Sequence, residues 1–210
     1  MRNFSTPLSY LVLSTLVLST LLCAACSSDE VDSDEEARRA YLAMDASIGT
    51  SITLGFQGFN AASSANIDAQ TTTATKAGML TVTGQVDQGS SSNKGMRLRV
   101  GMVDYDDGPV AYNDDGDSVH VVFDTDTDPA TQPALSMQLK GIPTGTLDGT
   151  LMGVYHLDGD IIGDLTLNIS FAGTLMAGSG SEVLRVPGST TVTGTATNAD
   201  GGVYNITLTL

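Results

Sequence analysis

The feature that most constrains this chain is a two-residue alternation of apolar and polar side chains, which begins near residue 50 and recurs to residue 210. Successive side chains of a β-strand point to opposite faces of a sheet, so the pattern is typical of strands that bury one face. About ten such short runs, separated by Gly, Asp and Asn turns, predict a single all-β antiparallel domain over residues 50–210. The alternation does not decide between a β-sandwich and a closed β-barrel. The clearest runs have these apolar members: Ile52/Leu54/Phe56, Leu80/Val82/Val86, Met96/Leu98/Val100/Met102, Val119/Val121/Phe123, Leu135/Met137/Leu139 and Leu165/Leu167/Ile169/Phe171.

Two pairs of runs predict hairpins with a defined register. Pairing Val86 near Met96 places the apolar residues of both runs on one face and sets Arg97 beside Gln85 on the other. At the end of the chain, a turn over residues 199–202 joins two runs whose threonines share one face. A threonine-rich exposed face is typical of a half-buried antiparallel sheet.

A helix is predicted over residues 34–49. Ser33 and Glu36 form the S-x-x-E pattern of a capping box, and the residues between them are acidic, as the first turn of a helix favours. Apolar residues then recur at helical spacing up to Gly49, which fits a helix stop. We expect the face carrying Tyr41 and Met44 to pack on the domain or to cover a sheet edge.

The first 25 residues have the composition of an export signal. Arg2 is the only charge before an apolar stretch from Leu8 to Leu22, and small residues follow up to Cys26. Five Ser and Thr residues dilute the stretch, and an acidic segment follows, so removal is a better interpretation than a membrane-spanning helix. Residues 1–25 are therefore predicted to be a signal peptide, and residues 26–33 an acidic flexible tether.

The sequence Cys23-Ala24-Ala25-Cys26 resembles the lipobox of bacterial lipoprotein precursors. In that class the cysteine that follows the small residues receives lipid on sulfur and becomes the first residue of the mature protein. The resemblance implies that Cys26 anchors the chain to a membrane through palmitate-like acyl chains. Ser27 rather than Asp follows the cysteine, which in the class implies transfer to the outer membrane, on its periplasmic or surface face.

The charge balance excludes some partners. The formal net charge is −15, and removal of residues 1–25 takes away only Arg2, which makes it −16. Nucleic acid requires clustered Lys and Arg, so it is not an expected partner. An acidic surface also disfavours peripheral binding to anionic lipid, which leaves the lipid on Cys26 as the expected membrane contact.

Aspartate is concentrated between residues 104 and 128, where nine occur. Hard carboxylate ligands at this density suit Ca²⁺. Asp124, Asp126 and Asp128 are the predicted ligands, because residues two apart lie on one side of an extended chain. The simpler alternative is that these carboxylates only keep an exported sheet soluble. No cofactor is required by any other pattern in the chain.

Function is constrained less than fold. The first hypothesis is a lipid-anchored, non-catalytic envelope module that binds another envelope component or forms part of a surface layer. The second is a carrier that encloses a small ligand in an apolar barrel cavity. The third is a hydrolase built on carboxylates or on His120, which is expected to point away from the core between Val119 and Val121.

Overall fold

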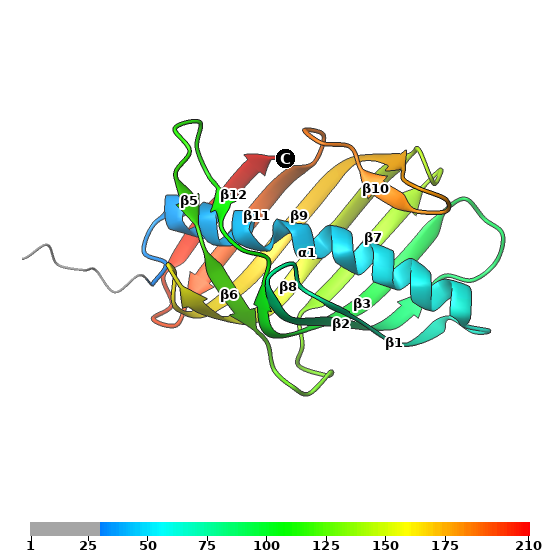
Figure 1. Cartoon of the computed structure of the whole chain (residues 1–210), viewed down its shortest axis with the longest axis horizontal. Coiled ribbons are helices and arrows are strands. Elements are labelled where there is room, and N and C mark those ends of the chain that lie inside the picture. Colours follow the sequence, from blue (N-terminus) through cyan, green and yellow to red (C-terminus); the bar gives the residue numbers. More distant parts are fainter. Residues whose placement is uncertain (1–29) are drawn as a thin grey trace, which may run out of the picture.

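A computed structural model describes residues 30–210, and its first element is one long helix (Figure 1). Helix α1 (Asp34–Ala61) begins as predicted, because the Ser33 side chain accepts a hydrogen bond from the Glu36 N–H at 3.2 Å. The Glu36 carboxylate accepts from the Asp32 N–H at 2.9 Å, which completes the cap one residue earlier than a standard capping box. Within residues 30–210 no helix is long and apolar enough to cross a membrane.

The predicted end of this helix at Gly49 is wrong. Residues 50–61 continue the helix, although their apolar residues alternate like those of a strand. Ile52 and Leu54 are buried and Phe56 is half-buried, so this part of the helix is held by its contacts with the rest of the domain. The β-domain therefore begins at Asn66 rather than at residue 50.

Twelve strands follow the helix. Ten form one antiparallel sheet, and β4 and β5 form a separate hairpin. The polar residues 60–76, which show no apolar alternation, contain the edge strand β1. The strand bounds are β1 (Asn66–Thr73), β2 (Ala77–Val86), β3 (Lys94–Asp106), β4 (Val110–Ala111), β5 (Ser118–Val119), β6 (Val121–Asp124), β7 (Ala134–Lys140), β8 (Thr146–Gly159), β9 (Gly163–Ala177), β10 (Val183–Arg185), β11 (Thr191–Asn198) and β12 (Val203–Thr209).

The sheet is open and curves around α1. Its strands follow the order β1-β2-β3-β6-β8-β9-β11-β12, while β7 lies between β3 and β8 and β10 pairs with β9. Helix α1 lies against both terminal strands, β1 and β12, and thereby covers the concave face between them (Figure 1). The prediction of an all-β antiparallel domain with an N-terminal helix is confirmed. The sheet forms one layer, which the helix covers. The terminal strands of the sheet, β1 and β12, do not pair with each other, so the sheet is not a closed barrel.

Both predicted hairpins are confirmed. Val86 lies opposite Met96 and Gln85 opposite Arg97 in the β2–β3 pair, and Val192 lies opposite Leu208 in the β11–β12 pair. On the last hairpin the inward side chains of Val192, Ala196 and Ile206 are fully buried. Its threonines at 191, 193, 207 and 209 are exposed.

The sequence T-V-T-G occurs twice, and in both copies its glycine lies very close to the neighbouring strand. Gly84 in β2 and Gly194 in β11 have φ angles of 125° and 156°, which L-residues rarely adopt. A Cβ at either position would lie 2.2 Å from a carbonyl oxygen of the next strand, that of Arg97 or Asn168. Each glycine lies one strand in from an end of the sheet, where it allows close approach to the neighbouring strand.

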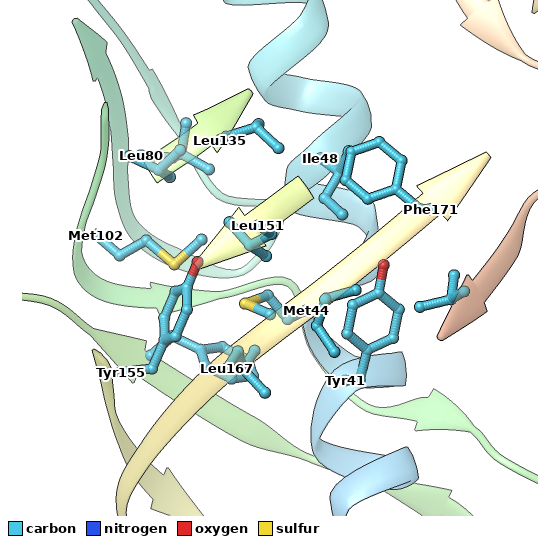
Figure 2. Close-up of a cluster of buried hydrophobic side chains, with 14 of the residues drawn as sticks. Tyr41, Met44, Ile48, Leu80, Met102, Leu135, Leu151, Tyr155, Leu167 and Phe171 are labelled. Carbon is cyan, nitrogen blue, oxygen red and sulfur yellow. The ribbon is translucent and has the colours of Figure 1, made fainter. Parts of the chain in front are cut away.

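The space between α1 and the sheet is filled by one contiguous apolar core (Figure 2). Tyr41, Met44 and Ile48 of α1 pack there against side chains from several strands. Residues 30–33, the described part of the predicted tether, also join the body, since Val31 is buried and Glu30 pairs with Ile162. Because this core is continuous within residues 30–210, we expect that span to fold without the preceding residues. The strand residues labelled in Figure 2 are Leu80, Met102, Leu135, Leu151, Tyr155, Leu167 and Phe171.

Candidate functional site

The predicted lipid-bearing Cys26 and the signal segment 1–25 lie outside the described residues. The predicted calcium ligands, in contrast, lie in a well-defined segment. β6 and β7 occupy the same position between β3 and β8, and residues 125–133 leave the sheet between them as a loop (Figure 1). We call residues 125–133 the outer loop.

The three predicted ligands do not point at one place. Asp124 ends β6, and its carboxylate accepts a hydrogen bond from the Asp104 N–H at 2.9 Å. Asp128 accepts from the Ala130 N–H at 2.9 Å within the outer loop, and Asp126 is exposed. In residues 30–210 no three His, Cys, Asp or Glu side chains are grouped as a metal site requires. Calcium binding stays a prediction, and it requires the outer loop to move so that the three carboxylates face one ion.

Another part of the aspartate-rich segment forms a cluster of ionisable side chains. Asp106 at the end of β3 accepts hydrogen bonds from His120 Nε2 and from the Gly108 N–H, both at 2.8 Å. The Lys76 ammonium lies 3.6 Å from the other Asp106 oxygen and 3.5 Å from His120 Nε2. Asp160 accepts from the His120 backbone N–H at 2.9 Å. The cluster therefore ties together the turns before β2 and after β8.

Burial and hydrogen bonding act in opposite directions on Asp106, whose side chain is only 9% exposed. Burial raises the pKa of Asp106, but the hydrogen bonds from His120 and Gly108 and the nearby Lys76 charge outweigh it, so the pKa lies below its ordinary value. In the preceding residue, burial and the hydrogen bond to Asp107 raise the pKa of the Tyr105 hydroxyl well above its ordinary value. At neutral pH Asp106 is a fixed negative charge, and Tyr105 remains protonated.

The His120–Asp106 pair resembles half of an acid–base site. His120 points away from the core as predicted, between buried Val119 and Val121. Its ring contacts in the described chain are a carboxylate and an ammonium, and a hydrolase would also need a nucleophile within hydrogen-bond reach. The second histidine, His156, pairs with Asp164 at 2.7 Å on the exposed face of the sheet.

A groove on the outer face of the sheet is a candidate binding site. Met79 of β2 and Val103 of β3 lie directly opposite each other, and they are 45% and 49% exposed. The groove has a volume of about 330 Å³, within the range of ligand-binding pockets. We call it the outer groove. It is lined by Ala69, Met79, Thr81, Thr83, Gly101, Met102, Val103, Thr125, Asp126, Thr127, Pro129 and Gln132.

One wall of the outer groove is the outer loop, which is fixed to the sheet. Arg99 donates to the Gln132 carbonyl at 2.8 Å, and the Thr125 hydroxyl accepts from the Met102 N–H at 2.9 Å. Gly101 leaves room for the Gln132 amide, which would lie 2.5 Å from a Cβ at that position. The wall is therefore preformed, and binding there would not require the loop to become ordered.

A second feature, on the opposite side of the sheet, is a shielded ion pair between α1 and β10. The Arg185 guanidinium binds both carboxylate oxygens of Asp45, at 2.9 and 2.6 Å, and the Tyr41 hydroxyl donates to the same carboxylate at 3.2 Å. The Asp45 and Arg185 side chains are 15% and 14% exposed. This pair fastens the β9–β11 connection to the middle of the helix.

Sequence reasoning missed the outer groove. The available signal was that Met79 and Val103 are apolar residues on the polar side of a hairpin whose register was predicted correctly. Comparison of the chain with protein-family models, curated proteins and solved structures finds no match. The case for any site therefore depends on its geometry.

Proposed function

We propose that this chain is a lipid-anchored protein of the bacterial cell envelope whose β-domain is a non-catalytic module that binds another envelope protein through the outer groove. The observation that carries the proposal is the exposed pair Met79 and Val103 beside a preformed wall. Covering such side chains on binding contributes up to about 1.5–3 kcal/mol each.

The chemistry of the groove favours a protein partner. Its floor is apolar and without aromatic rings, and its rim carries threonine hydroxyls and the Gln132 amide. An apolar side chain of the partner fits the floor, while the partner's backbone N–H and C=O groups bond to the rim. The strong net negative charge of the chain disfavours self-association at this face and favours a neutral or basic partner.

The anchor hypothesis is supported by the order of the N-terminal features: a charged start, an apolar stretch, small residues, and then Cys26. Two or three acyl chains on one cysteine give stable membrane attachment, since each buried CH₂ contributes about 0.8 kcal/mol. The described domain begins at Glu30, four residues after Cys26, so its first turn of helix would lie close to the membrane. The outer membrane, on its periplasmic or surface face, is the proposed location.

Photocrosslinking in the bacterium that makes this protein tests the proposal. A benzophenone-bearing phenylalanine in place of Val103, in the full precursor, is expected to form one discrete adduct with an envelope protein. Met79→Asp in the same chain should abolish that adduct, because it places a charge on the floor of the groove. The matched control is the same photoreactive residue in place of Val203, which is 60% exposed on a distant strand. Absence of an adduct at position 103, or the same adduct from position 203, would reject the groove as the binding site.

A further inference from the structure

The outer groove lies beside an irregularity in the β2–β3 pair. Met79 pairs with Val103, and the register of the two strands shifts just beyond that pair. Gly78 of β2 therefore lies opposite two residues of β3, Asp104 and Tyr105. This two-against-one arrangement is a β-bulge, which can redirect a side chain. Val103 and Asp104 are both exposed, whereas in a regular strand the second of two neighbours would turn toward the core. The bulge thus places a carboxylate next to the apolar floor of the groove.

Backbone contacts hold Asp104 in this position. Its φ angle of 47° is the one positive value at a non-glycine residue within residues 30–210, and Asp adopts such angles more readily than most residues. The Asp104 N–H donates to the Asp124 carboxylate at 2.9 Å. Gly78 leaves room for the Asp104 carbonyl, which a Cβ at position 78 would strike. None of these contacts uses the Asp104 carboxylate.

Two carboxylates at the outer groove are available to a partner. In the described part of the chain, the hydrogen bonds of Asp104 and Asp126 beyond the strand pairing involve only their backbone groups. Both residues are exposed. Asp126 is also the one charged residue among those that line the groove. The groove therefore combines an apolar floor with negative charge at its rim.

The two basic side chains that flank this part of the β2–β3 pair have other partners. Arg99 of β3 donates to the Gln132 carbonyl at 2.8 Å and so fastens the outer loop. Lys76, which precedes β2, lies 3.6 Å from a carboxylate oxygen of Asp106 in the ionisable cluster. The charge at the rim of the groove is therefore left for a cation that the partner supplies.

We propose that the outer groove recognises a segment of the partner protein in which a lysine or arginine lies within three residues of an apolar side chain. This inference rests on the proposed function, because it specifies the partner at the same groove. The apolar side chain covers Met79 and Val103, and the basic group pairs with Asp104 and Asp126. Three residues of extended chain span about 10 Å, enough to reach from the floor to the rim. Such charge pairs set the orientation and the rate of association more than the affinity.

The crosslinked adduct formed from position 103 tests the composition of this segment. Chymotrypsin does not cut at basic residues, so it leaves them in the crosslinked peptide for mass spectrometry. The peptide should contain Lys or Arg within three residues of the residue that carries the benzophenone link. A linked residue without a basic neighbour in that range would overturn the proposal.

The paired substitution Asp104→Asn/Asp126→Asn tests the two carboxylates. Asparagine has nearly the same size and also adopts positive φ angles, so the bulge should persist. In isolated membranes at about 50 mM NaCl, the yield of the adduct from position 103 should fall about five-fold, as expected for the loss of two exposed ion pairs. About 500 mM NaCl should lower the wild-type yield to that of the variant and leave the variant unchanged, because salt screens exposed charges.

Asp114→Asn/Asp115→Asn is the matched control. Both residues are exposed in the turn between β4 and β5, so the substitution removes the same charge away from the groove and should leave the yield unchanged. Thermal unfolding checks that each variant folds. An equal yield in wild type and Asp104→Asn/Asp126→Asn, or an equal loss in the control, would overturn the inference of a basic segment and leave the groove as the binding site. Absence of any adduct from position 103 would reject the proposed function as well.

Discussion

At the scale of single residues, the Asp45–Arg185 pair is the contact whose loss should be felt most. Asp45→Ala would leave the Arg185 guanidinium shielded from water without a counter-charge, which costs about 3 kcal/mol in comparable pairs. Equilibrium denaturation in urea measures this as a lower midpoint with an unchanged slope. The double variant Asp45→Ala/Arg185→Ala should lose clearly less than the sum of the two single variants. A cost below about 1 kcal/mol for Asp45→Ala would show that solvent screens the pair.

Residue type also explains which elements the sequence predicts and which it does not. Strands with one buried face, such as β3 and β9, have the full alternation and were predicted with the correct faces. β1 was missed because it is an edge strand with Ile67 as its one fully buried side chain, so it shows almost no apolar period. Residues 50–61 were mistaken for a strand because Ile52, Leu54 and Phe56 alternate with Ser51, Thr53 and Gly55, which suggests a period of two, although Ile52 and Leu54 are both buried by the helix.

At the scale of elements, the close pairing of β11 with β9 depends on Gly194. Gly194→Ala would place a methyl group within 2.2 Å of the Asn168 carbonyl oxygen, so β9 and β11 must move apart. Gly201→Ala is the matched control, because Gly201 also has a positive φ, of 84°, but has no neighbour within 4 Å of a Cβ. We expect Gly194→Ala to cost about 1–3 kcal/mol more than Gly201→Ala in thermal or urea unfolding. Equal costs would mean that the close approach of Gly194 to β9 is not needed for stability.

The outer loop provides a second prediction at this scale. If Asp124, Asp126 and Asp128 bind Ca²⁺, then Ca²⁺ should raise the unfolding temperature of residues 27–210 more than Mg²⁺ or NaCl at equal ionic strength. At ten times the dissociation constant the stabilisation is about 1.4 kcal/mol, which a melting curve resolves. Asp124→Asn/Asp126→Asn should remove the effect. Asp124 and Asp128 already accept backbone hydrogen bonds. The same rise in all three salts would show that the three carboxylates are only surface charges screened by salt, and would contradict calcium binding.

At the scale of the whole molecule, less of the site than of the fold could be predicted. The outer groove is formed by β1, β2, β3 and the outer loop, which connects β6 to β7. Its residues are therefore up to 63 positions apart in the chain, from Ala69 to Gln132. Periodicity gives the face of each strand, but it does not give the path of a loop over that face. The ionisable cluster was missed for the same reason. Asp106 and His120 belong to the noted aspartate-rich segment, but Lys76 joins them only through the sheet.

Two carboxyl groups with lowered pKa values predict that the stability of the fold decreases at acidic pH. The folded pKa of Asp106 is below its unfolded value, as is that of Glu35, which the Arg38 hydrogen bond lowers to about 2. A lowered folded pKa adds stability above the unfolded pKa, near 4, and this stability is lost as the pH falls toward the folded pKa. Glu35 is exposed, so Asp106 should dominate.

We therefore expect the difference in unfolding temperature between wild type and Asp106→Asn to be largest at pH 6 and to shrink below pH 4. Asp200→Asn, in the exposed β11–β12 turn, is the control and should show no such trend. A difference between wild type and Asp106→Asn that stays constant from pH 6 to pH 2 would contradict the assignment.

We propose that this domain is held in the cell envelope by lipid on Cys26, and metabolic labelling tests this proposal most directly. Cells that express the full precursor with labelled palmitate should yield a labelled protein of mature size in the membrane fraction, with Cys26 as its first residue. Cys26→Ser should abolish both the label and the cleavage, whereas Cys23→Ser should retain both. An unlabelled mature protein, or a mature N-terminus at another residue, would contradict the account.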